Sequence, residues 1–430
     1  MKRGGNAEHV SEPWKRGRLG DVCRVIPGYA FKSSDWQAEG IPVVKIKNIT
    51  TDNSVDLTDT DCVPESVLTP KLQKFVLKDG DILLAMTGAT AGKVGKVRSD
   101  RPILLNQRVA KIAPVDADYG FIWSVVSSQE YQEKFFHLAD GAAQPNMSGG
   151  QIEGLEIPLP PLAVQRRIAG ILSAYDELME NSQRRIRILE AMARALYREW
   201  FVLFRFPGHE KIPRVASALG DIPKGWEVRK VGDIAQTFRG RSYRSVDLAD
   251  EGGLPFLNLK CLDRDGGFRR SGLKRYTGEY KDSHIAKKGD IIMGVTDMTQ
   301  DRRIVARAAL VPTLDKEFGI TSMDLVRIEP KSLVPKVFIY SFLRFSSFAD
   351  EVKQHANGAN VLHLAPERIT DYQFSVPPAP IMHRFADLVA PTLESMDTLE
   401  NRIENLRRTR DLLLPRLLSG QIENLACPTE

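Results

Sequence analysis

The sequence predicts an α+β protein built from two similar halves, each a β-rich head followed by a long helix. Three observations support this prediction. The segment LPPL at residues 159–162 opens a helix-forming stretch, and VPPA at 376–379 opens another, so that Pro377 stands where Pro160 stands in the first half. Short segments of the heads recur in the same order. Both helical stretches carry a heptad pattern. A period of half the chain indicates domain duplication, since solenoid and propeller repeats run roughly 20 to 50 residues.

The heads correspond less regularly than the helices. The matched segments are Leu19-Gly20-Asp21 with Val231-Gly232-Asp233, Gly40-Ile41-Pro42 with Gly253-Leu254-Pro255, Gly80-Asp81-Ile82 with Gly289-Asp290-Ile291, and Asp140-Gly141-Ala142 with Asn357-Gly358-Ala359. Within each head, short β-branched and apolar runs alternate with glycine-rich turns, which predicts strands. One amphipathic helix is predicted around residues 121–138, and its counterpart around 338–354. The offsets change between these segments, so we infer that loops were rewritten while strands and helices kept their order.

The helical stretches carry the sharpest physical pattern. Steps of four and three connect Ile168, Leu172, Tyr175, Met179, Ser182, Ile186, Leu189, Ala193 and Leu196, and the same steps connect Phe385, Val389, Thr392, Met396, Leu399, Ile403, Leu406, Arg410 and Leu413. Such a seam, kept over four heptads with charged residues between, favours a coiled coil. Polar residues at Ser182, Thr392 and Arg410 interrupt it, and residues of this kind set helix register.

Each seam would form a rod about 43 Å long at the usual helical rise. We expect the two rods to lie antiparallel with one head near each end. The heads would then be separated by about one turn of duplex DNA, roughly 34 Å, or somewhat more. The alternative is a pair of amphipathic helices, each packed on its own head. Prolines open both rods, and Pro207-Gly208 is predicted to end the first.

The composition argues against a membrane-spanning or secreted protein. The chain has 430 residues, 42% of them hydrophobic, and a formal net charge of +5. No apolar run approaches the ~20 residues that span a bilayer, and the first residues lack the core of a signal peptide, so a cytoplasmic location is expected. Four scattered cysteines without metal spacing are interpreted as reduced thiols. The basic segment 264–275 is either a phosphate-binding patch or a solvated hairpin.

No catalytic constellation is evident. The segment Gly88-Ala89-Thr90-Ala91-Gly92-Lys93-Val94 resembles a P-loop, but three residues separate its glycines instead of four. Val94 stands where a magnesium-binding Ser or Thr is required, so nucleotide binding is rejected. The seven histidines show no metal-ligand spacing, and no methyltransferase or helicase motif is found. The sequence therefore predicts a protein that is not an enzyme and binds no metal. Dispersed carboxylates of a nuclease remain an alternative.

The order head, helix, head, helix is accompanied by four segments, namely Ile157-Pro158-Leu159-Pro160-Pro161, Ala195-Leu196-Tyr197-Arg198-Glu199-Trp200-Phe201, Arg205-Phe206-Pro207-Gly208-His209-Glu210 and Arg410-Asp411-Leu412-Leu413-Leu414-Pro415-Arg416-Leu417-Leu418-Ser419-Gly420-Gln421-Ile422. In this order and these segments the chain resembles, over essentially its whole length, the specificity (S) subunit of type I restriction-modification enzymes. The resemblance implies target-recognition domains at 1–158 and 207–376 and conserved helical spacers at 159–206 and 377–430.

The resemblance also implies a division of labour between subunits. Each head would read one half of a split, asymmetric DNA site, and the helices would act as a ruler. Two methyltransferase (M) subunits would dock on the helices and carry S-adenosylmethionine, while restriction (R) subunits would add ATP-driven translocation and cleavage. No cofactor is expected on this chain itself, and ATP and magnesium are expected on the partners.

Side-chain type and the alignment of the halves select candidate DNA contacts. Lys and Arg would hold phosphates, whereas amide and hydroxyl side chains on loops would reach base edges in the major groove. In the first head the candidates are Lys32, Ser33, Lys45, Lys47, Asn48, Thr87, Thr90, Lys93, Lys96, Asn106, Gln107, Arg108, Gln144, Asn146 and Ser148. In the second head they are Arg239, Arg241, Ser242, Arg244, Asn258, Lys260, Thr296, Asp297, Thr299, Gln300, Arg302, Arg303, Asn360 and His363. Asn106 and Gln107 would alternatively satisfy buried backbone groups.

Candidate partner contacts lie on the outward faces of the rods. They are Ile171, Leu178, Arg185, Tyr197, Trp200, Phe201, Leu393, Leu414 and Leu417. Aromatic residues concentrated at a rod end favour a docking site. The alternative is that they cap the core of the neighbouring head. Two rival functions also stand beside DNA recognition, a stand-alone nuclease and a purely structural scaffold without salt-sensitive DNA binding.

Overall fold

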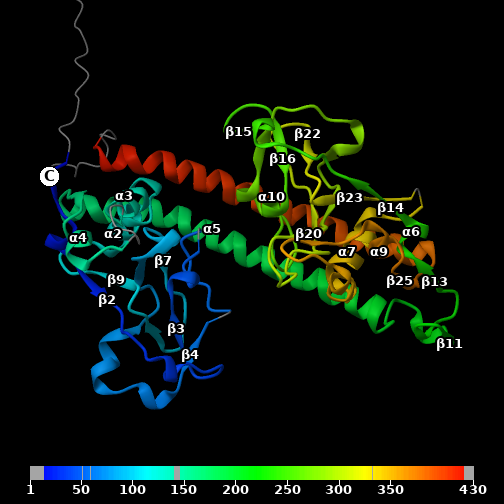
Figure 1. Cartoon of the computed structure of the whole chain (residues 1–430), viewed down its shortest axis with the longest axis horizontal. Helices are drawn as coiled ribbons and strands as arrows, with labels where there is room; N and C mark the ends of the chain where they lie inside the picture. Colours follow the sequence, from blue (N-terminus) through cyan, green and yellow to red (C-terminus); the bar gives the residue numbers. More distant parts are fainter. Residues whose placement is uncertain (1–13, 51, 59, 140–145, 332, 421–430) are drawn as a thin grey trace, which may run out of the picture. The chain divides into compact units, whose positions relative to one another are not determined.

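A computed structural model describes residues 14–420 of the chain except 51, 59, 140–145 and 332. The chain divides into two compact units. Unit 1 comprises residues up to Glu180 and those from Glu404 onward, and unit 2 comprises Asn181–Ile403. Two long helices, α5 (Leu162–Tyr197) and α10 (Ala379–Leu418), each contribute residues to both units (Figure 1). We call the part of unit 1 from β1 to β10 head 1, and the part of unit 2 from β11 to β25 head 2.

Two sheets form the framework of head 1. The first is antiparallel, in the order β2-β9-β6-β7, and the second has the order β4-β3-β8-β5 with β3 and β8 parallel. The first and last strands of the head, β1 and β10, pair with each other. The bounds are β1 Arg16–Arg18, β2 Cys23–Pro27, β3 Ile41–Val44, β4 Cys62–Val63, β5 Val76–Leu77, β6 Ile82–Ala85, β7 Val94–Lys96, β8 Ile103–Leu105, β9 Val109–Pro114 and β10 Glu156–Pro158.

Short helices cover the antiparallel sheet of head 1. They are α1 Leu19–Val22, α2 Tyr119–Val126, α3 Gln129–Ala139 and α4 Gly149–Glu153. The single helix predicted at 121–138 is wrong, because the chain turns between α2 and α3. There Ser128 Oγ accepts a hydrogen bond from Tyr131 N at 3.3 Å, the local capping contact that lets a new helix begin. The core of this layer joins α2, α3, β6 and β9 to the start of α5.

Head 2 repeats this topology. Its antiparallel sheet has the order β14-β23-β19-β21, and its second sheet has the order β15-β17-β16-β22-β18 with β16 and β22 parallel. The pairs β13–β25, β11–β12 and β20–β24 complete the strands described. The bounds are β11 Arg214–Ser217, β12 Gly220–Pro223, β13 Glu227–Lys230, β14 Ala235–Arg239, β15 Leu248–Ala249, β16 Leu254–Leu257, β17 Lys274–Tyr276, β18 Ile285–Lys287, β19 Ile291–Gly294, β20 Thr296–Asp297, β21 Ala308–Leu310, β22 Phe318–Thr321, β23 Leu325–Pro330, β24 Leu362–His363 and β25 Gln373–Val376.

The helices of head 2 also match those of head 1. They are α6 Val231–Ile234, α7 Lys336–Phe345, α8 Phe348–Val352 and α9 Pro366–Thr370. The helix predicted at 338–354 is again broken, here at Ser346, whose Oγ accepts from Phe348 N at 3.1 Å. The equivalent strand order, the equivalent parallel pair and the equivalent helix break confirm that the two halves of the chain are copies of one fold.

The heptad seams of both long helices are shielded from solvent. Each predicted seam residue from Ile168 to Leu196, and from Phe385 to Leu413, is buried or half-buried. In unit 1 the start of α5, including Ile168 and Leu172, shares a core with Leu414 and Leu417 near the end of α10. In unit 2 the end of α5 meets the start of α10, where the rings of Tyr197 and Phe385 lie 6.2 Å apart. Within each unit the parts of α5 and α10 that meet are those expected of antiparallel helices, and they also pack on the core of the head.

The first long helix ends before the predicted Pro207-Gly208. After Tyr197 the backbone widens into a π-helical turn, Arg198–Val202, and Phe204 then adopts a positive φ of 59°. Trp200 and Phe201 lie in this turn and are buried in the core of head 2.

Candidate nucleic-acid interface

Equivalent main-chain hydrogen bonds in the two heads connect loops that are far apart in the sequence. In head 1, Gln107 N donates to Tyr29 O at 2.9 Å, and Met86 N donates to Arg108 O at 3.0 Å. Met147 N then donates to Met86 O at 3.0 Å. Residues from four distant parts of the sequence thus meet where strands β2, β6 and β8 end.

Head 2 contains an equivalent set of bonds. Met323 N donates to Arg241 O at 2.8 Å, Val295 N to Asp324 O at 2.9 Å, and Leu364 N to Val295 O at 2.8 Å. Each donor and acceptor occupies the position that the duplication assigns to its counterpart in head 1. Because main-chain hydrogen bonds depend little on side-chain identity, this frame persists while its side chains differ.

We call the four positions that this frame brings side by side the recognition row. In head 1 the row consists of Tyr29, Gln107, Thr87 and Asn146, and in head 2 it consists of Arg241, Met323, Thr296 and His363. Thr87 pairs with Asn146 as Thr296 pairs with His363, and paired residues on adjacent strands present their side chains on one face.

A glycine precedes the row in both heads and is required there. A Cβ atom on Gly28 would lie 2.2 Å from the carbonyl oxygen of Asn106, and one on Gly240 would lie 2.1 Å from that of Ser322. A side chain at either glycine would therefore clash with a backbone carbonyl group, and the backbone around it would have to move. The close approach is what allows Tyr29 and Arg241 to bond to the neighbouring loops.

The exposed members of the row differ chemically between the heads. Head 1 exposes the amides Gln107 and Asn146, whereas head 2 exposes the thioether of Met323 and the imidazole of His363. Thr296 is buried, and its Oγ1 lies 3.4 Å from His363 Nδ1, which orients the ring. Within the part of the chain that the structure describes, Thr87 Oγ1 and Arg241 Nε are buried without a hydrogen-bond partner. Buried polar atoms without a partner are costly in free energy.

Sequence reasoning missed Tyr29 and Met323. Both follow from the correspondence between the heads, because Gly28-Tyr29 aligns with Gly240-Arg241 and Gln107-Arg108 aligns with Met323-Asp324. Met323 was not a candidate because the candidates were chosen for polar side chains. Tyr29 was not recognised because the spacing between matching residues of the two heads varies from loop to loop. The ring of Tyr29 packs at 5.1 Å from Phe31 and 5.5 Å from Phe75, so this residue is half-buried.

Two lysines of head 1 share one carboxylate. Lys45 Nζ lies 2.9 Å and Lys47 Nζ 3.2 Å from Asp61 Oδ2. Their hydrogen bonds, that of Lys45 first, hold the pKa of Asp61 below its usual value. Lys45 also lies 3.4 Å from the centre of the Trp36 ring, a cation–π contact. Because Lys45 and Lys47 share the single carboxylate of Asp61, this part of the surface carries a net positive charge.

The side chain of Lys96 points toward two aromatic rings of α2. Its Nζ lies 4.3 Å from the centre of the Trp123 ring on α2 and 5.6 Å from that of Tyr119. Burial lowers its pKa. The Lys96 side chain therefore packs on α2, and its contact with DNA stays a prediction.

Several side chains that were predicted to contact DNA form hydrogen bonds to the main chain of their own turns. Asn48 is buried and bonds to Lys45 N and Asp56 O, both at 2.9 Å, and Asn258 bonds in the same way to Lys260 N and Gly272 O. Buried Asn106 accepts from Arg108 N at 3.3 Å, as its alternative interpretation predicted. Asp297, 2% exposed, accepts from the main chain of Thr299 at 2.8 Å and of Ile304 at 3.1 Å. The polar atoms of these side chains bond within the protein, as does the hydroxyl of buried Thr296, and their contacts with DNA stay predictions.

The remaining candidates of head 1 lie around the row. Lys32, Ser33, Arg108 and Ser148 are exposed, Thr90 and Lys93 are half-buried, and Gln144 lies outside the described residues. Ser148 caps α4 by accepting from Gln151 N at 3.2 Å. The hydroxyl of Thr90, like that of Thr87, is buried without a partner within the described ranges.

The remaining candidates of head 2 come from four segments of the chain. Exposed residues are Arg239, Ser242, Arg244, Lys260, Thr299, Gln300, Arg303 and Asn360. Gln300 Nε2 donates to Ala359 O at 3.0 Å, and Arg302 Nη1 donates to Gln354 Oε1 at 3.0 Å. These bonds join the loop after β20 to the segment before β24.

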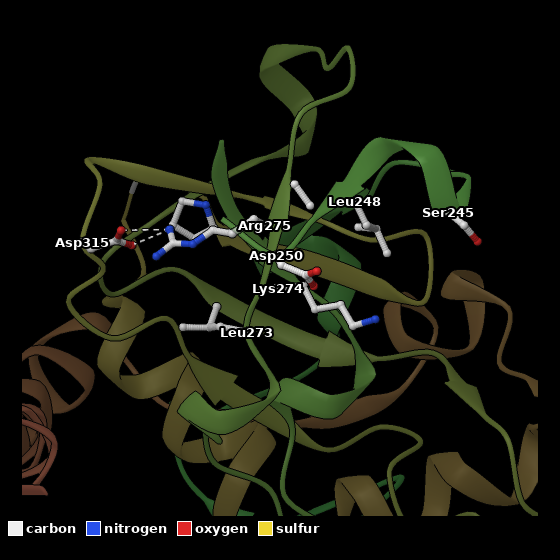
Figure 2. Close-up of a pocket in the computed structure, with 9 residues that line it drawn as sticks. Ser245, Leu248, Asp250, Leu273, Lys274, Arg275 and Asp315 are labelled. Carbon is white, nitrogen blue, oxygen red and sulfur yellow. Dashed lines mark hydrogen bonds and ion pairs between the residues drawn. The ribbon is translucent and has the colours of Figure 1, made fainter. Parts of the chain in front are cut away.

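Several cationic side chains of the basic segment 264–275 make contacts within the protein. Arg270 lies 3.2 Å from Asp397 on α10, with its side chain only 19% exposed, and Arg269 donates to Lys260 O at 2.7 Å. Figure 2 shows Arg275 directed toward Asp315, 2.8 Å away, beside a cavity of about 540 Å³ that Lys274 and Asp250 also line. Carboxylates balance the cations here, which favours the solvated-hairpin interpretation over a phosphate-binding patch.

The predicted partner surface divides in two. Tyr197, Trp200 and Phe201 are buried in the core of head 2, and Leu414 and Leu417 are buried in that of unit 1. Their placement on an outward face is corrected, because these side chains cap the adjacent cores. Ile171 and Leu393 are half-buried, while Arg185 and Leu178 are exposed, Leu178 at 42%.

Metal clusters and membrane-spanning helices are both absent from the described residues. Among the residues that the structure describes, no group of three or more His, Cys, Asp or Glu side chains is arranged to hold a metal ion. Among the helices of those same ranges, none has the length and apolar composition needed to cross a membrane.

Comparison with known proteins places this architecture in a family. The profile of the type I restriction modification DNA specificity domain matches residues 11–191 and again 223–407. The chain is 25% identical to the type I restriction enzyme MjaIX specificity subunit of Methanocaldococcus jannaschii, covering 96% of this chain and 94% of that protein. It is 22% identical to the HindI specificity subunit of Haemophilus influenzae, covering 95% and 99%.

A solved structure shows the same fold. The type I restriction-modification system S subunit from M. genitalium superimposes with a TM-score of 0.54 at 18% identity, covering 96% of this chain and 98% of that one. The repeated profile match spans most of the chain and coincides with the duplication seen in its strands. The chain belongs to the type I restriction modification DNA specificity family.

Proposed function

We propose that each recognition row reads one half of a bipartite, asymmetric DNA site through the major groove. The observation that carries this proposal is the pair of rows itself, in which one hydrogen-bonded frame presents different side chains. Amides such as Gln107 and Asn146 can pair with base edges, as can the imidazole of His363. Two heads with unlike rows would read unlike half-sites, so the complete target would be asymmetric.

Cations around each row would hold the duplex. In head 1 these are Lys32, Lys47 and Arg108, and in head 2 they are Arg239, Lys260 and Arg303. Such contacts fix register and orientation but carry no sequence information. They also release counterions, so affinity should fall steeply with added salt.

We further propose that the chain works without catalysing a reaction itself. Methyltransferase subunits would dock on exposed helix residues such as Arg185 and Leu178 and would bring S-adenosylmethionine. Restriction subunits would bring ATP and magnesium. The relatives support assembly of this kind, since they are named as specificity subunits of restriction enzymes. A partner that acts on chromosomal DNA would place the complex in the cytoplasm.

The direct test is DNA binding by the purified full-length chain. A pool of randomised duplexes should yield one enriched sequence with two separated halves. Affinity for that duplex should fall linearly on a logarithmic salt scale. Exchange of Lys47 for Ala should weaken binding to all duplexes alike, whereas Asn146→Ala should relax preference within one half only. No enrichment together with salt-insensitive binding would exclude DNA recognition and favour a scaffold. Plasmid cleavage with magnesium alone would indicate a nuclease.

The ruler function is proposed separately. One heptad inserted into α5 and one into α10 would preserve the seam and lengthen each helix by about 10 Å. That length corresponds to about three base pairs, so the gap in the selected sequence should grow by that amount. An unchanged gap with intact halves would show that the helices do not set the spacing.

A further inference from the structure

The position shared by Gln107 and Met323 carries a polar side chain in one row and an apolar side chain in the other. Both backbone amides make the equivalent hydrogen bond, to Tyr29 O and to Arg241 O. Both side chains are exposed, yet one ends in an amide and the other in a thioether. Met323 exposes 45% of its surface, beside a loop in which Met298 exposes 68%. Exposed apolar side chains that gather at one place can mark an interaction site.

The surroundings of Met323 favour a nucleic-acid ligand over a protein core. Arg241 lies next to it in the row, and Arg239 and Lys260 are exposed on the adjoining segments. Arg241 Nε is buried without a partner in the part of the chain described here. An apolar group held among cations matches the major groove at an A·T pair, where the thymine methyl projects between phosphate backbones.

We propose that this shared position determines specificity, with Met323 packing on the methyl group of a thymine and Gln107 pairing with an adenine. The inference rests on the proposed DNA recognition and adds which base each head selects there. Gln offers a donor and an acceptor that match N6 and N7 of adenine. Methionine offers neither with useful strength, but its flexible, polarisable chain fits a methyl surface closely.

Deoxyuridine supplies a probe that isolates the methyl group, because it differs from thymidine only by lacking that group. The duplex selected by the full-length chain would be resynthesised with deoxyuridine at one thymine position at a time. For the wild-type chain, one position in one half-site should lose about fourfold in affinity, the value of burying one such group. Met323→Leu should keep this sensitivity, and Met323→Ala should lose it.

Reciprocal exchanges test the shared position itself. Met323→Gln should change the preferred base at the uridine-sensitive position to adenine, and Gln107→Met should change one adenine position of the other half-site to thymine. Leu333→Gln is the matched control, since Leu333 is 77% exposed in head 2 but follows the far end of β23. It should alter neither half.

The outcomes separate the two proposals. A selected bipartite sequence whose uridine sensitivity is the same in the wild type and in Met323→Ala would overturn the role of Met323 while leaving DNA recognition intact. The role of the shared position is likewise overturned if both exchanges change one and the same half-site. A chain that selects no sequence at all would overturn the proposed function, and this inference with it.

Discussion

Arg410 Nη1 lies 2.8 Å from Asp176 Oδ1, and this ion pair joins α10 to α5 within unit 1. Asp176 Oδ2 also accepts a hydrogen bond from Trp123 Nε1 at 3.2 Å, so the pair extends to α2 of head 1. Burial opposes the charged form of Arg410, but Asp176 and Asp411 more than offset it and hold its pKa above the ordinary value. Arg410 is one of the polar interruptions of the heptad seam, and its contact shows what that interruption does. A polar pair within a seam favours the register in which its two partners meet.

Replacing Arg410 by Ala should destabilise unit 1. The carboxylate of Asp176 would remain only 23% exposed without its cation, and loss of one partner from such a pair costs about 1 to 3 kcal/mol at partial burial. We expect the thermal unfolding midpoint to fall by several degrees. Arg407→Ala is the matched control, because its pair with Glu404 is 3.4 Å long and the two side chains are 44% and 54% exposed. Equal effects of the two substitutions would contradict the register role.

Asp397 and Glu180 occupy equivalent positions of the two long helices, equally far along the chain from Pro377 and Pro160, but differ in burial. Asp397 is 16% exposed and receives Arg270 at 3.2 Å, Lys288 at 3.0 Å and Thr313 Oγ1 at 2.8 Å. Glu180 is 55% exposed and pairs with Arg98 at 2.6 Å. Asp397→Ala should therefore cost about 2 kcal/mol, and Glu180→Ala less than about 1 kcal/mol, in denaturant unfolding.

The contribution of Asp397 should also depend on pH. Burial by itself would raise its pKa, but the bonds from Lys288 and Thr313 together lower it below the usual value. A lowered folded-state pKa means that the stabilisation is complete above the unfolded value near about 3.9 and is lost as pH falls through the folded value. The difference between wild type and Asp397→Ala should thus be constant near neutral pH and shrink in strong acid. A difference that grows in acid would refute this account.

Glu400 on α10 should act in the opposite sense. Burial raises the pKa of its carboxyl to about 7, so the folded protein holds a proton that the unfolded chain releases near the ordinary value of 4.5. Stability should therefore decline as pH rises between those two values. Glu400→Gln should be nearly neutral at pH 4.5 and stabilising above pH 7, on the order of 1 to 3 kcal/mol. Unfolding midpoints of both proteins across this range would check it, and a pH-independent difference would be evidence against the shift.

Gly28 and Gly240 should tolerate no side chain. Gly28→Ala or Gly240→Ala forces a Cβ to within 2.2 Å of a carbonyl oxygen, so we expect a loss of about 2 kcal/mol or more and disturbed recognition in one half-site. Gly170→Ala is the control, because nothing lies within 4 Å of a Cβ at this position in α5. That change should raise stability by about 0.5 to 1 kcal/mol. Loss of stability in the control would indicate that the strain is not local.

The parts of the fold that depend on local pattern could be predicted from the sequence. Every seam residue from Ile168 to Leu196 is shielded, because a heptad repeat specifies one helix face whatever surrounds it. The break between α2 and α3 could not be found in this way. The apolar pattern continues across Ser127, whereas the turn is made by local polar contacts such as the bond from Tyr131 N to Ser128 Oγ, which apolar periodicity does not register.

The candidate site was predicted only in part, for a physical reason. Side-chain type identifies groups that can hydrogen-bond, but not whether the fold already uses them, and Asn258 and Asp297 bond to their own turns. Conversely, Met323 has no polar atom of the kind sought and lies in the row through its main chain. The correspondence between the halves was the information that could have located it.

The most direct test of two unlike reading heads is a map of methylated adenines in DNA from cells that express this chain with its methyltransferase subunits. The wild type should give one bipartite motif with two different halves. His363→Ala should relax or change one half, and Asn146→Ala should relax or change only the other. A contiguous motif, or a single substitution that alters both halves together, would contradict the account.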